Sequence, residues 1–163
     1  MAHGKVEKTN AARLLDRAKI NYELVPYEVD EEHLAATHVA EQLGEEIATV
    51  FKTLVLKGDR TGYFVCVVPG NHEVDLKAAA RVSGNKKADL IPMKELLPVT
   101  GYIRGGCSPV GMKKQLRTVF ASQALAQETI LVSAGKIGYQ VEVAPQALIA
   151  LVRAGTAELT IES

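Results

Sequence analysis

The sequence predicts a mixed α+β fold in one domain, with a mixed and largely antiparallel sheet that can curl into a barrel. Two observations carry this prediction. Extended segments come in pairs around tight turns, at 50–57 and 62–68 around GDRTG and at 129–134 and 138–143 around GKIG. Segments with helical spacing and capping residues are interleaved with these pairs. The 163 residues suffice for one domain with a buried core.

Capping residues set the expected helices. Thr, Asn and Asp accept hydrogen bonds from the free N–H groups at a helix start, Pro suits the first turn, and Gly suits the residue after the last turn. By these signals, helices are expected from Thr9 or Asn10 to about Lys19, over 35–43 ahead of Gly44, over 76–83 between Asp75 and Gly84, over 93–98 with Pro98 as the stop, and from Pro145 to about Arg153.

Four further strands are expected outside the two hairpins. They are 22–29, 88–91, 118–121 and 157–162. Pro26 has no N–H to donate to a neighbouring strand, so the strand at 22–29 should lie at a sheet edge or contain a bulge.

A lysine interrupts the apolar stretch VFKTLVL at 50–56. Alternation in an extended chain places Val50, Lys52, Leu54 and Leu56 on one face and Phe51, Thr53 and Val55 on the other. Both faces are largely apolar, which indicates a strand that is covered on both sides. A buried ammonium group costs several kcal/mol unless it finds a partner, so Lys52 either extends its head to water at the strand end or faces a wet cavity.

Composition excludes strong binding of nucleic acid by charge alone. The 19 Lys and Arg residues equal the 19 Asp and Glu residues, so the net charge is zero, whereas a protein that grips nucleic acid by itself normally has a basic excess. The chain has no Trp and 5% aromatic residues, which disfavours a platform for stacked bases.

The cysteine pattern and hydropathy favour a cytoplasmic protein. Cys66 lies in an apolar strand and Cys107 in a glycine loop, so the two thiols do not form a disulfide framework. No apolar run approaches the length that spans a membrane, and the first ten residues lack the core of a signal peptide. His33 and His38 are five residues apart, and no metal-binding motif occurs, so we expect no metal.

The stretch TGYIRGGCSPVGMKK at 100–114 is the second unusual feature. Its glycines permit either a tight structural turn or a nest of backbone N–H groups that holds an anion or a developing oxyanion. No histidine is spaced to act as a base for Cys107, and Ser108 is followed by Pro109, so Ser108 fits a hydrogen-bonding role better than a nucleophilic one.

Three other groups of basic residues can be solvated or can contact a ligand. Lys136 lies between two glycines in SAGKIG, a tight hairpin turn that can also face a ligand. Lys86 with Lys87, and Lys113 with Lys114 and Arg117, form either solvated faces or local phosphate contacts.

Taken in this order and spacing, the segments VFKTL, DLKAAA, TGYIRGGCSPVGMKKQL and ETILVSAGKIG resemble the YbaK/EbsC family of Cys-tRNA(Pro) deacylases, relatives of the editing domain inserted in bacterial prolyl-tRNA synthetases. The resemblance covers nearly the whole chain and implies one editing domain over residues 1–163, with a curled, barrel-like mixed sheet surrounded by helices. It also implies hydrolysis of mischarged tRNA(Pro) without metal or organic cofactor, with prolyl-tRNA synthetase as a partner.

The resemblance assigns roles to individual residues. The essential lysine of the family falls on Lys52, and its G-x-x-x-P loop falls on 105–109, whose backbone would hold the substrate carbonyl or the terminal adenosine. We therefore expect catalytic roles for Lys52, Gly106 and Ser108. Substrate binding is expected for Tyr22 at the pocket mouth and for Gly105, Cys107, Pro109, Gly111, Gly135, Lys136 and Gln140.

Gln140 stands where relatives carry Asp or His, which changes both the charge and the hydrogen-bonding capacity of the site. In the cysteine-specific relatives the thiol of the substrate is thought to attack, which explains why no Ser–His or Cys–His pair is visible here. Two alternatives stay open: a deacylase for Ala-tRNA(Pro) or another small amino acid that uses water, and a binding module that recognises a nucleotide or tRNA 3′ end without hydrolysis.

Overall fold

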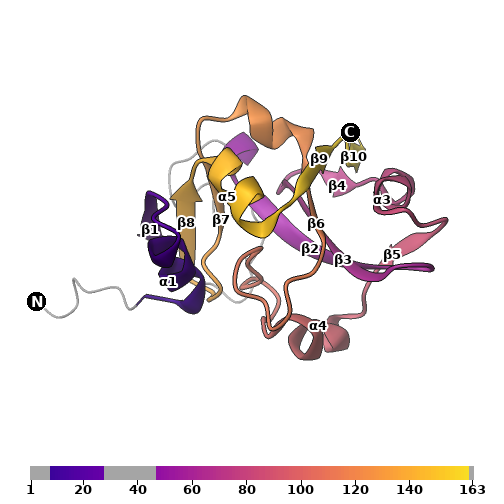
Figure 1. Ribbon diagram of the computed structural model, residues 1–163, viewed down its shortest axis with the longest axis horizontal. Coiled ribbons are helices and arrows are strands. Elements are labelled where there is room, and N and C mark those ends of the chain that lie inside the picture. Colours follow the sequence, from indigo (N-terminus) through magenta and orange to yellow (C-terminus); the bar gives the residue numbers. More distant parts are fainter. Residues whose placement is uncertain (1–7, 28–46, 162–163) are drawn as a thin grey trace, which may run out of the picture.

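The computed structural model describes residues 8–27 and 47–161. Its strands form two main sheets and a short pair (Figure 1). The five-stranded sheet has the order β5 (Ala88–Leu90), β2 (Phe51–Gly58), β3 (Gly62–Pro69), β6 (Thr118–Ala121) and β9 (Gly155–Ala157). The three-stranded sheet has the order β1 (Tyr22–Pro26), β8 (Tyr139–Val143) and β7 (Ile130–Ser133), and β10 (Thr160–Ile161) pairs with β4 (Glu73–Val74).

Helices cover these sheets. They are α1 (Asn10–Arg17), α3 (Leu76–Ser83), α4 (Met93–Thr100) and α5 (Pro145–Val152), with short 3-10 helices at Ile47–Thr49 and Ser122–Ala126. Thr9 caps α1 and Asp75 caps α3, and both side chains accept from backbone N–H groups of the first turn as expected.

The sheets are mixed, as predicted. The β2–β3, β2–β5, β1–β8 and β7–β8 pairs are antiparallel, whereas β3–β6 and β6–β9 are parallel. One isolated parallel bridge, between Val50 and Leu131, joins the two main sheets at the start of β2. The sheets therefore curl toward each other without closing into a barrel, and the mixed α+β prediction is confirmed.

Strand β2 separates two hydrophobic cores. Phe51 and Val55 pack in the first core, with residues of α1, α5 and the three-stranded sheet, while Leu56 packs in the second core with α3. Leu54 also packs against the second core from a partly buried position. The expected alternation and the double coverage of this strand are therefore confirmed, and Lys52 lies on the face of the second core.

Three expected boundaries are wrong. Helix α4 continues past Pro98 to Thr100. Pro98 has no N–H group, so the helix loses only the hydrogen bond to the carbonyl of Lys94, which is an exposed residue. The helix ends at Gly101, whose N–H donates to the carbonyl of Leu97. The stretch 157–162 does not form one strand, because the chain leaves β9, buries Leu159 and then pairs with β4.

The third boundary concerns β1. The strand ends at Pro26, since Tyr27 is no longer part of it and residues 28–29 lie outside the described ones, and it lies at a sheet edge as Pro26 predicted. The helix expected over 35–43, with Gly44 after it, lies outside the described residues. Among residues 8–27 and 47–161, no helix is long and apolar enough to cross a membrane.

Candidate functional site

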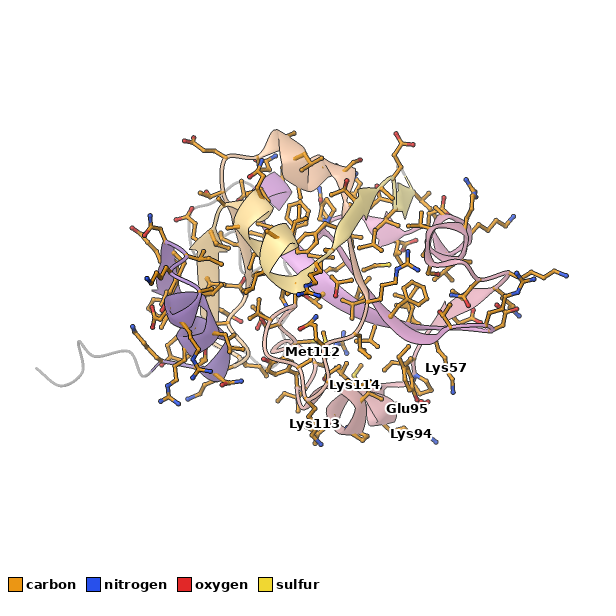
Figure 2. The ribbon with its side chains drawn as sticks, in the orientation of Figure 1. Lys57, Lys94, Glu95, Met112, Lys113 and Lys114 are labelled. Carbon is orange, nitrogen blue, oxygen red and sulfur yellow. The ribbon has the colours of Figure 1, made fainter. Side chains whose placement is uncertain are left out.

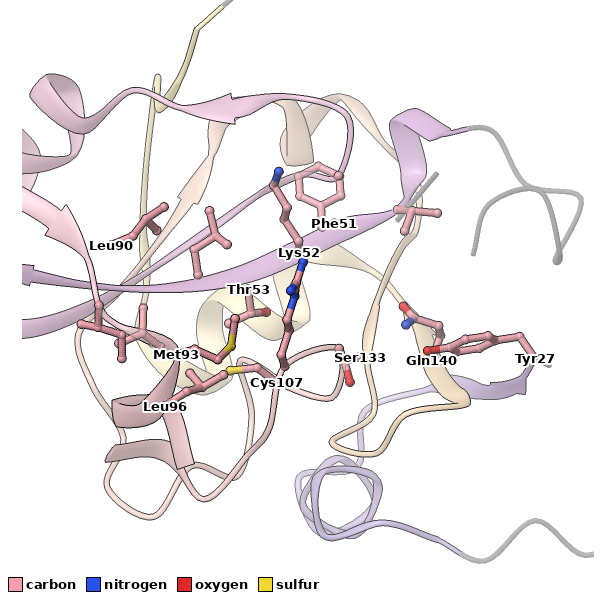
Figure 3. A pocket seen from close by; sticks show the side chains of 17 residues that line it. Tyr27, Phe51, Lys52, Thr53, Leu90, Met93, Leu96, Cys107, Ser133 and Gln140 are labelled. Atoms are coloured by element: carbon pink, nitrogen blue, oxygen red, sulfur yellow. The ribbon is translucent and has the colours of Figure 1, made fainter. Parts of the chain in front are cut away.

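A cavity of about 450 Å³ follows the N-terminal half of β2 (Figure 3). β3 pairs with the whole of β2, whereas β5 pairs only with Leu56–Gly58 and β7 meets the strand only at the Val50–Leu131 bridge, so the described strands leave the second edge open around Thr53. The wall consists of Tyr27, residues 50–55, Gly70, Leu90, Ile91, Met93, Leu96, Arg104, Gly105, Cys107, Ser133 and Gln140. The volume falls in the range of roughly 300–1,000 Å³ that is usual for small-ligand sites.

Lys52 is a half-buried cation in this wall. Burial lowers the pKa of its ammonium group, and the negative charge of Glu73 partly opposes that shift. No described residue forms a hydrogen bond or close ion pair with its Nζ. Such a cation gains free energy when an acceptor or an anion enters the cavity.

The cavity reaches round the open edge of β2, so it meets side chains of both faces. In Figure 3, Lys52 and Thr53 leave the strand on opposite sides. The N–H of Ile91 donates to the carbonyl of Val55 across the β5 edge, at 3.2 Å. Because backbone groups face the same edge at every second residue, the N–H and C=O of Thr53 face the open edge. A ligand therefore meets both the side chain and the backbone of Thr53.

Two buried polar atoms in the wall have no partner among the described residues. They are Oγ1 of Thr53 and Oε1 of Gln140, and the Gln140 side chain belongs to a residue that is only 5% exposed. Gln140 lies opposite Ser133 across the β7–β8 pair, and both line the cavity. An unpaired buried polar atom is costly, so these two atoms favour a ligand that supplies hydrogen bonds.

Tyr102 anchors the glycine loop that forms the opposite wall. Its hydroxyl donates to the carbonyl oxygen of Val110. A Cβ on Gly111 would lie 2.7 Å from the Tyr102 oxygen, and one on Gly135 would lie 3.0 Å from its ring, and both glycines have positive φ. Gly111 and Gly135 therefore make room for Tyr102, and neither lines the cavity as the substrate-binding prediction required.

The backbone of the loop offers fewer free donors than expected. The N–H of Gly106 donates to the carbonyl of Ile103, so it is not available for a substrate oxyanion. Gly106 instead allows close packing, because a Cβ there would lie 3.3 Å from the backbone nitrogen of Ile137. Gly105 and Cys107 line the cavity, and no described residue pairs with their N–H groups.

Ser108 is also structural. It is fully buried, and its hydroxyl accepts from the N–H of Val110 inside the loop. Neither Ser108 nor the buried Pro109 reaches the cavity wall. The serine is thus a turn-forming residue here, and its expected catalytic contact is not found.

Cys107 lines the cavity as a neutral thiol. Burial raises its pKa to about 12, so the thiolate is scarce at neutral pH. In this position the Cys107 side chain forms part of the pocket surface.

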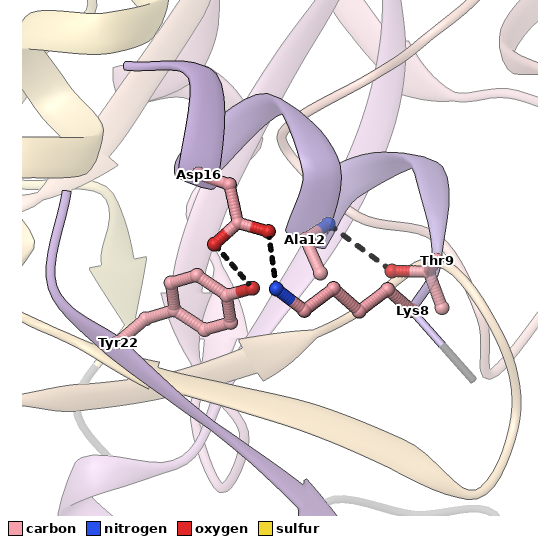
Figure 4. Close-up of polar contacts among 5 residues, drawn as sticks. All are labelled: Lys8, Thr9, Ala12, Asp16 and Tyr22. Carbon is pink, nitrogen blue, oxygen red and sulfur yellow. Dashed lines mark hydrogen bonds and ion pairs between the residues drawn. The ribbon is translucent and has the colours of Figure 1, made fainter. Parts of the chain in front are cut away.

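Two residues predicted to bind substrate lie elsewhere. Tyr22 donates its hydroxyl to Asp16, which forms an ion pair with Lys8 at 2.6 Å (Figure 4). Tyr27, five residues later, lines the cavity in its place. Lys136 is exposed with its Nζ 5.5 Å from the centre of the Tyr139 ring, outside the cavity wall.

The basic clusters have separate roles. Arg117 donates to the carbonyls of Val82 and Ser83 at the end of α3, which is a structural contact. Lys86 and Lys87 are exposed away from the cavity wall, and Lys113 and Lys114 are exposed beside α4. In residues 8–27 and 47–161, no three His, Cys, Asp or Glu side chains are grouped so that they could hold a metal ion.

Sequence reasoning missed several wall residues. Arg104 lines the cavity from the glycine stretch. The two glycines that follow it indicate a role for the backbone, so the sequence gives no separate signal for the Arg104 side chain. Thr53 is a polar residue in a strand covered on both sides, which is a signal that could have found it. Ser133 and Tyr27 come at the ends of strands and carry no comparable signal.

We expect three Gly→Ala substitutions to separate backbone strain from collision with Tyr102. Gly111→Ala combines both and should lower the free energy of unfolding by about 3 kcal/mol or more. Gly62→Ala has positive φ but open space and should cost about 1–2 kcal/mol, while Gly155→Ala has neither problem and should change stability by less than about 0.5 kcal/mol. Urea unfolding measures all three, and equal losses at Gly111 and Gly62 would exclude the collision.

Thr53→Val and Gln140→Leu should leave the free energy of unfolding unchanged or raise it by about 1 kcal/mol, because each removes a buried atom that has no partner. Gln123→Leu is the matched control. The Oε1 of Gln123 is also buried without a partner, but its Nε2 donates to Thr160, so this substitution should cost about 1 kcal/mol in the same unfolding assay. A large loss in Gln140→Leu would instead mean that the amide has a structural role.

Comparisons with known proteins bear on this site. The sequence profile of the aminoacyl-tRNA editing domain matches residues 30–151. EbsC of Enterococcus faecalis, which has the provisional name Cys-tRNA(Pro)/Cys-tRNA(Cys) deacylase, is 49% identical over 154 residues, or 94% of each chain. The proline–tRNA ligase of Thermosipho melanesiensis is 34% identical over 74 residues, which are 45% of this chain and 13% of that enzyme.

A solved structure supports the fold. Its protein is provisionally designated a trans-editing enzyme for prolyl-tRNA synthetase. The structure matches with a TM-score of 0.81 and 24% identity over 96% of this chain and all of that one. The profile match and the similarity to EbsC together show the family: the chain belongs to the aminoacyl-tRNA editing domains.

Proposed function

We propose that the protein is a freestanding editing enzyme that hydrolyses mischarged Cys-tRNA(Pro) in trans. The observation that carries this proposal is a cavity lined by two cations, Lys52 and Arg104, and by neutral polar groups, without an activated nucleophile or a carboxylate among the described wall residues. Membership of the editing family and the similarity to EbsC over most of both chains support it.

The need for such an enzyme follows from the chemistry of amino-acid selection. Small side chains differ by only about 1–3 kcal/mol in a binding pocket, so a synthetase for proline cannot fully reject cysteine or alanine. The remedy is a second site that hydrolyses the wrong ester. An aminoacyl ester is already activated, so that site needs to position the ester and stabilise charge more than it needs a strong nucleophile.

In the proposed reaction, the substrate cysteine supplies the nucleophile. Its thiolate attacks its own ester carbonyl, a sulfur–carbon bond forms, and the bond from that carbon to the 3′ oxygen of the terminal adenosine breaks. The proton lost by the thiol balances the one gained by the leaving oxygen, with water as the carrier. Water then opens the cyclic thioester to free cysteine.

The chain contributes charge and position to each step. Lys52 and Arg104 favour the thiolate over the thiol, because a nearby cation lowers the pKa of an acidic group. The N–H groups of Gly105 and Cys107 are the available donors for the carbonyl oxygen. Thr53 and Gln140 supply hydrogen bonds to the amino acid or to the ribose, since both have unpaired atoms.

Hydrolysis of Ala-tRNA(Pro) by water is the runner-up. Attack by water is aided by a general base, and within the described wall there is no His, Asp or Glu to serve. This favours the thiol route over the water route. Simple binding of a tRNA 3′ end without turnover is the alternative from another class.

We expect Lys52→Ala to lower kcat/KM on Cys-tRNA(Pro) by about 100-fold or more, the usual effect of losing a group that stabilises transition-state charge. Lys57→Ala is the matched control on the same strand, because Lys57 is exposed and lies outside the cavity wall. The assay follows deacylation of Cys-, Ala- and Ser-tRNA(Pro), with and without prolyl-tRNA synthetase. The original protein should hydrolyse only the cysteinyl ester. Hydrolysis of Ala-tRNA(Pro) would favour the water route, and binding of tRNA without hydrolysis of any ester would favour the function of a binding module.

The pH dependence of kcat/KM should be bell-shaped. The rate rises with pH as the substrate thiol ionises, and it falls as Lys52 loses its proton, which happens below the ordinary lysine range because burial lowers its pKa. In Lys52→Arg the alkaline fall should move out of range, since Arg stays charged. The measurement covers about pH 6 to about pH 10.5, so that it reaches the ordinary lysine range, and is corrected for spontaneous hydrolysis. An unchanged alkaline limb in Lys52→Arg would assign it to another group.

A further inference from the structure

Exposed apolar side chains gather at one side of the cavity. Among the described residues, six large hydrophobic side chains are about half exposed, and four of them lie on β5, α4 and the loop that follows: Leu90, Met93, Leu97 and Ile103. Leu90 and Met93 also line the cavity. Figure 3 shows Met93 beside Leu96 below β2, with Leu90 above the strand. This apolar surface is therefore continuous with the pocket.

Cations surround the same surface. Figure 2 shows Lys94, Lys113 and Lys114 at the end of the molecule that carries α4. Lys113 is tied to that helix, because its N–H donates to Thr100 and its side chain lies over Gly101. Arg104 is exposed in the loop and reaches the cavity wall. Within residues 8–27 and 47–161 the only ion pair is Lys8–Asp16, so none of these four cations has a close carboxylate partner among those residues.

The acids near this surface do not cancel its charge. Glu95 accepts from the hydroxyl of Tyr63 and is thereby held toward β3. Asp89 is exposed on β5 and forms no ion pair with a described residue. Among the described residues of this surface, two acids stand against four cations, which is a local positive excess.

The net charge of zero conceals a strong asymmetry along the sequence. Residues 28–46 contain seven Asp and Glu and no Lys or Arg. Residues 8–27 and 47–161 contain 18 Lys and Arg against 10 Asp and Glu, a surplus of eight. The two signs of charge are therefore unevenly distributed along the sequence.

We infer that the rim, defined as Leu90, Met93, Leu97 and Ile103 with Lys94, Arg104, Lys113 and Lys114, docks the single-stranded 3′ end of the tRNA and its adjoining phosphates. The inference rests on the proposed function. If the esterified terminal nucleotide occupies the cavity, the nucleotides before it in the tRNA must pass over the mouth of the cavity. Unstacked bases offer faces that pack on apolar side chains, and phosphates pair with lysine and arginine. A protein partner fits less well, since lysine is depleted in the centres of protein interfaces.

The test compares Cys-tRNA(Pro) with 2′(3′)-O-cysteinyladenosine. Both carry the same cysteinyl ester on the terminal adenosine, but only the first has the preceding nucleotides of the tRNA. Lys94→Glu and Lys113→Glu should each raise KM for Cys-tRNA(Pro) about tenfold and reduce the slope of log affinity against log salt by about 1. Both variants should leave the hydrolysis of 2′(3′)-O-cysteinyladenosine within about twofold of the original rate, because neither side chain lines the cavity.

Lys77→Glu is the matched control. Lys77 and Lys94 are each exposed and are each the second residue of an eight-residue helix, α3 and α4, so the change in charge and its position in the helix are the same. This control variant should leave unchanged both the KM for Cys-tRNA(Pro) and the rate of hydrolysis of 2′(3′)-O-cysteinyladenosine. Leu97→Ser and Ile103→Ser test the apolar part and should raise KM for the tRNA alone.

Direct binding separates failure of the rim from failure of the proposed function. A fluorescent acceptor-stem minihelix that ends in CCA should bind more weakly to the Lys94→Glu and Lys113→Glu variants, and removal of its CCA end should abolish the difference. This holds whether or not the protein hydrolyses any ester. Unchanged minihelix binding in the two rim variants, or an equal loss of binding in Lys77→Glu, would overturn the inference. It would also be overturned if the rim variants bound prolyl-tRNA synthetase more weakly but bound the minihelix as well as the original protein does.

Discussion

The site depends on how strand β2 is paired. One edge of β2 is paired along its whole length with β3, and both faces are covered by hydrophobic cores. The second edge is bonded at Val55–Gly58 and at the Val50–Leu131 bridge, which leaves it open around Thr53. The pairing with β3 and the two cores fix the backbone of 51–55, while the open edge leaves it accessible to the cavity. A rigid strand with one free edge can therefore present Lys52 and Thr53 on two sides of one ligand without a mobile loop to hold them.

The glycine loop supplies the second wall through packing more than through free N–H groups. Tyr102 fits between Gly111 and Gly135, and Gly106 packs on the turn between β7 and β8, so three glycines fasten the loop to the three-stranded sheet. That sheet carries Ser133 and Gln140, and it meets β2 at the Val50–Leu131 bridge. The loop, the sheet and β2 are thus mutually braced, which keeps the two walls at a fixed separation.

The sequence predicted the elements well where one local signal decided the outcome. The caps Thr9 and Asp75 and the hairpin glycines gave correct elements, and alternation in VFKTLVL gave the correct faces of β2. Pro98 misled because one missing hydrogen bond does not end a short helix whose last turn is otherwise closed. The site was predicted in part: Lys52, Gly105, Cys107 and Gln140 meet in the cavity, while Gly106 and Ser108 turned out to be bound within their own loop. Local sequence cannot show whether a backbone N–H is already used, because its partner depends on the turn.

The charge distribution shows how a composition average can mislead about a nucleic-acid partner. Zero net charge argues against a strong electrostatic grip only if the two signs are evenly mixed, and here the described rim carries Lys94, Arg104, Lys113 and Lys114 against Glu95 and Asp89. Screening limits the reach of each charge to about 8 Å at physiological salt, so a ligand at the rim responds chiefly to Lys94, Arg104, Lys113 and Lys114. A modest number of phosphate contacts gives weak, salt-sensitive binding, which suits an enzyme that must release corrected tRNA quickly.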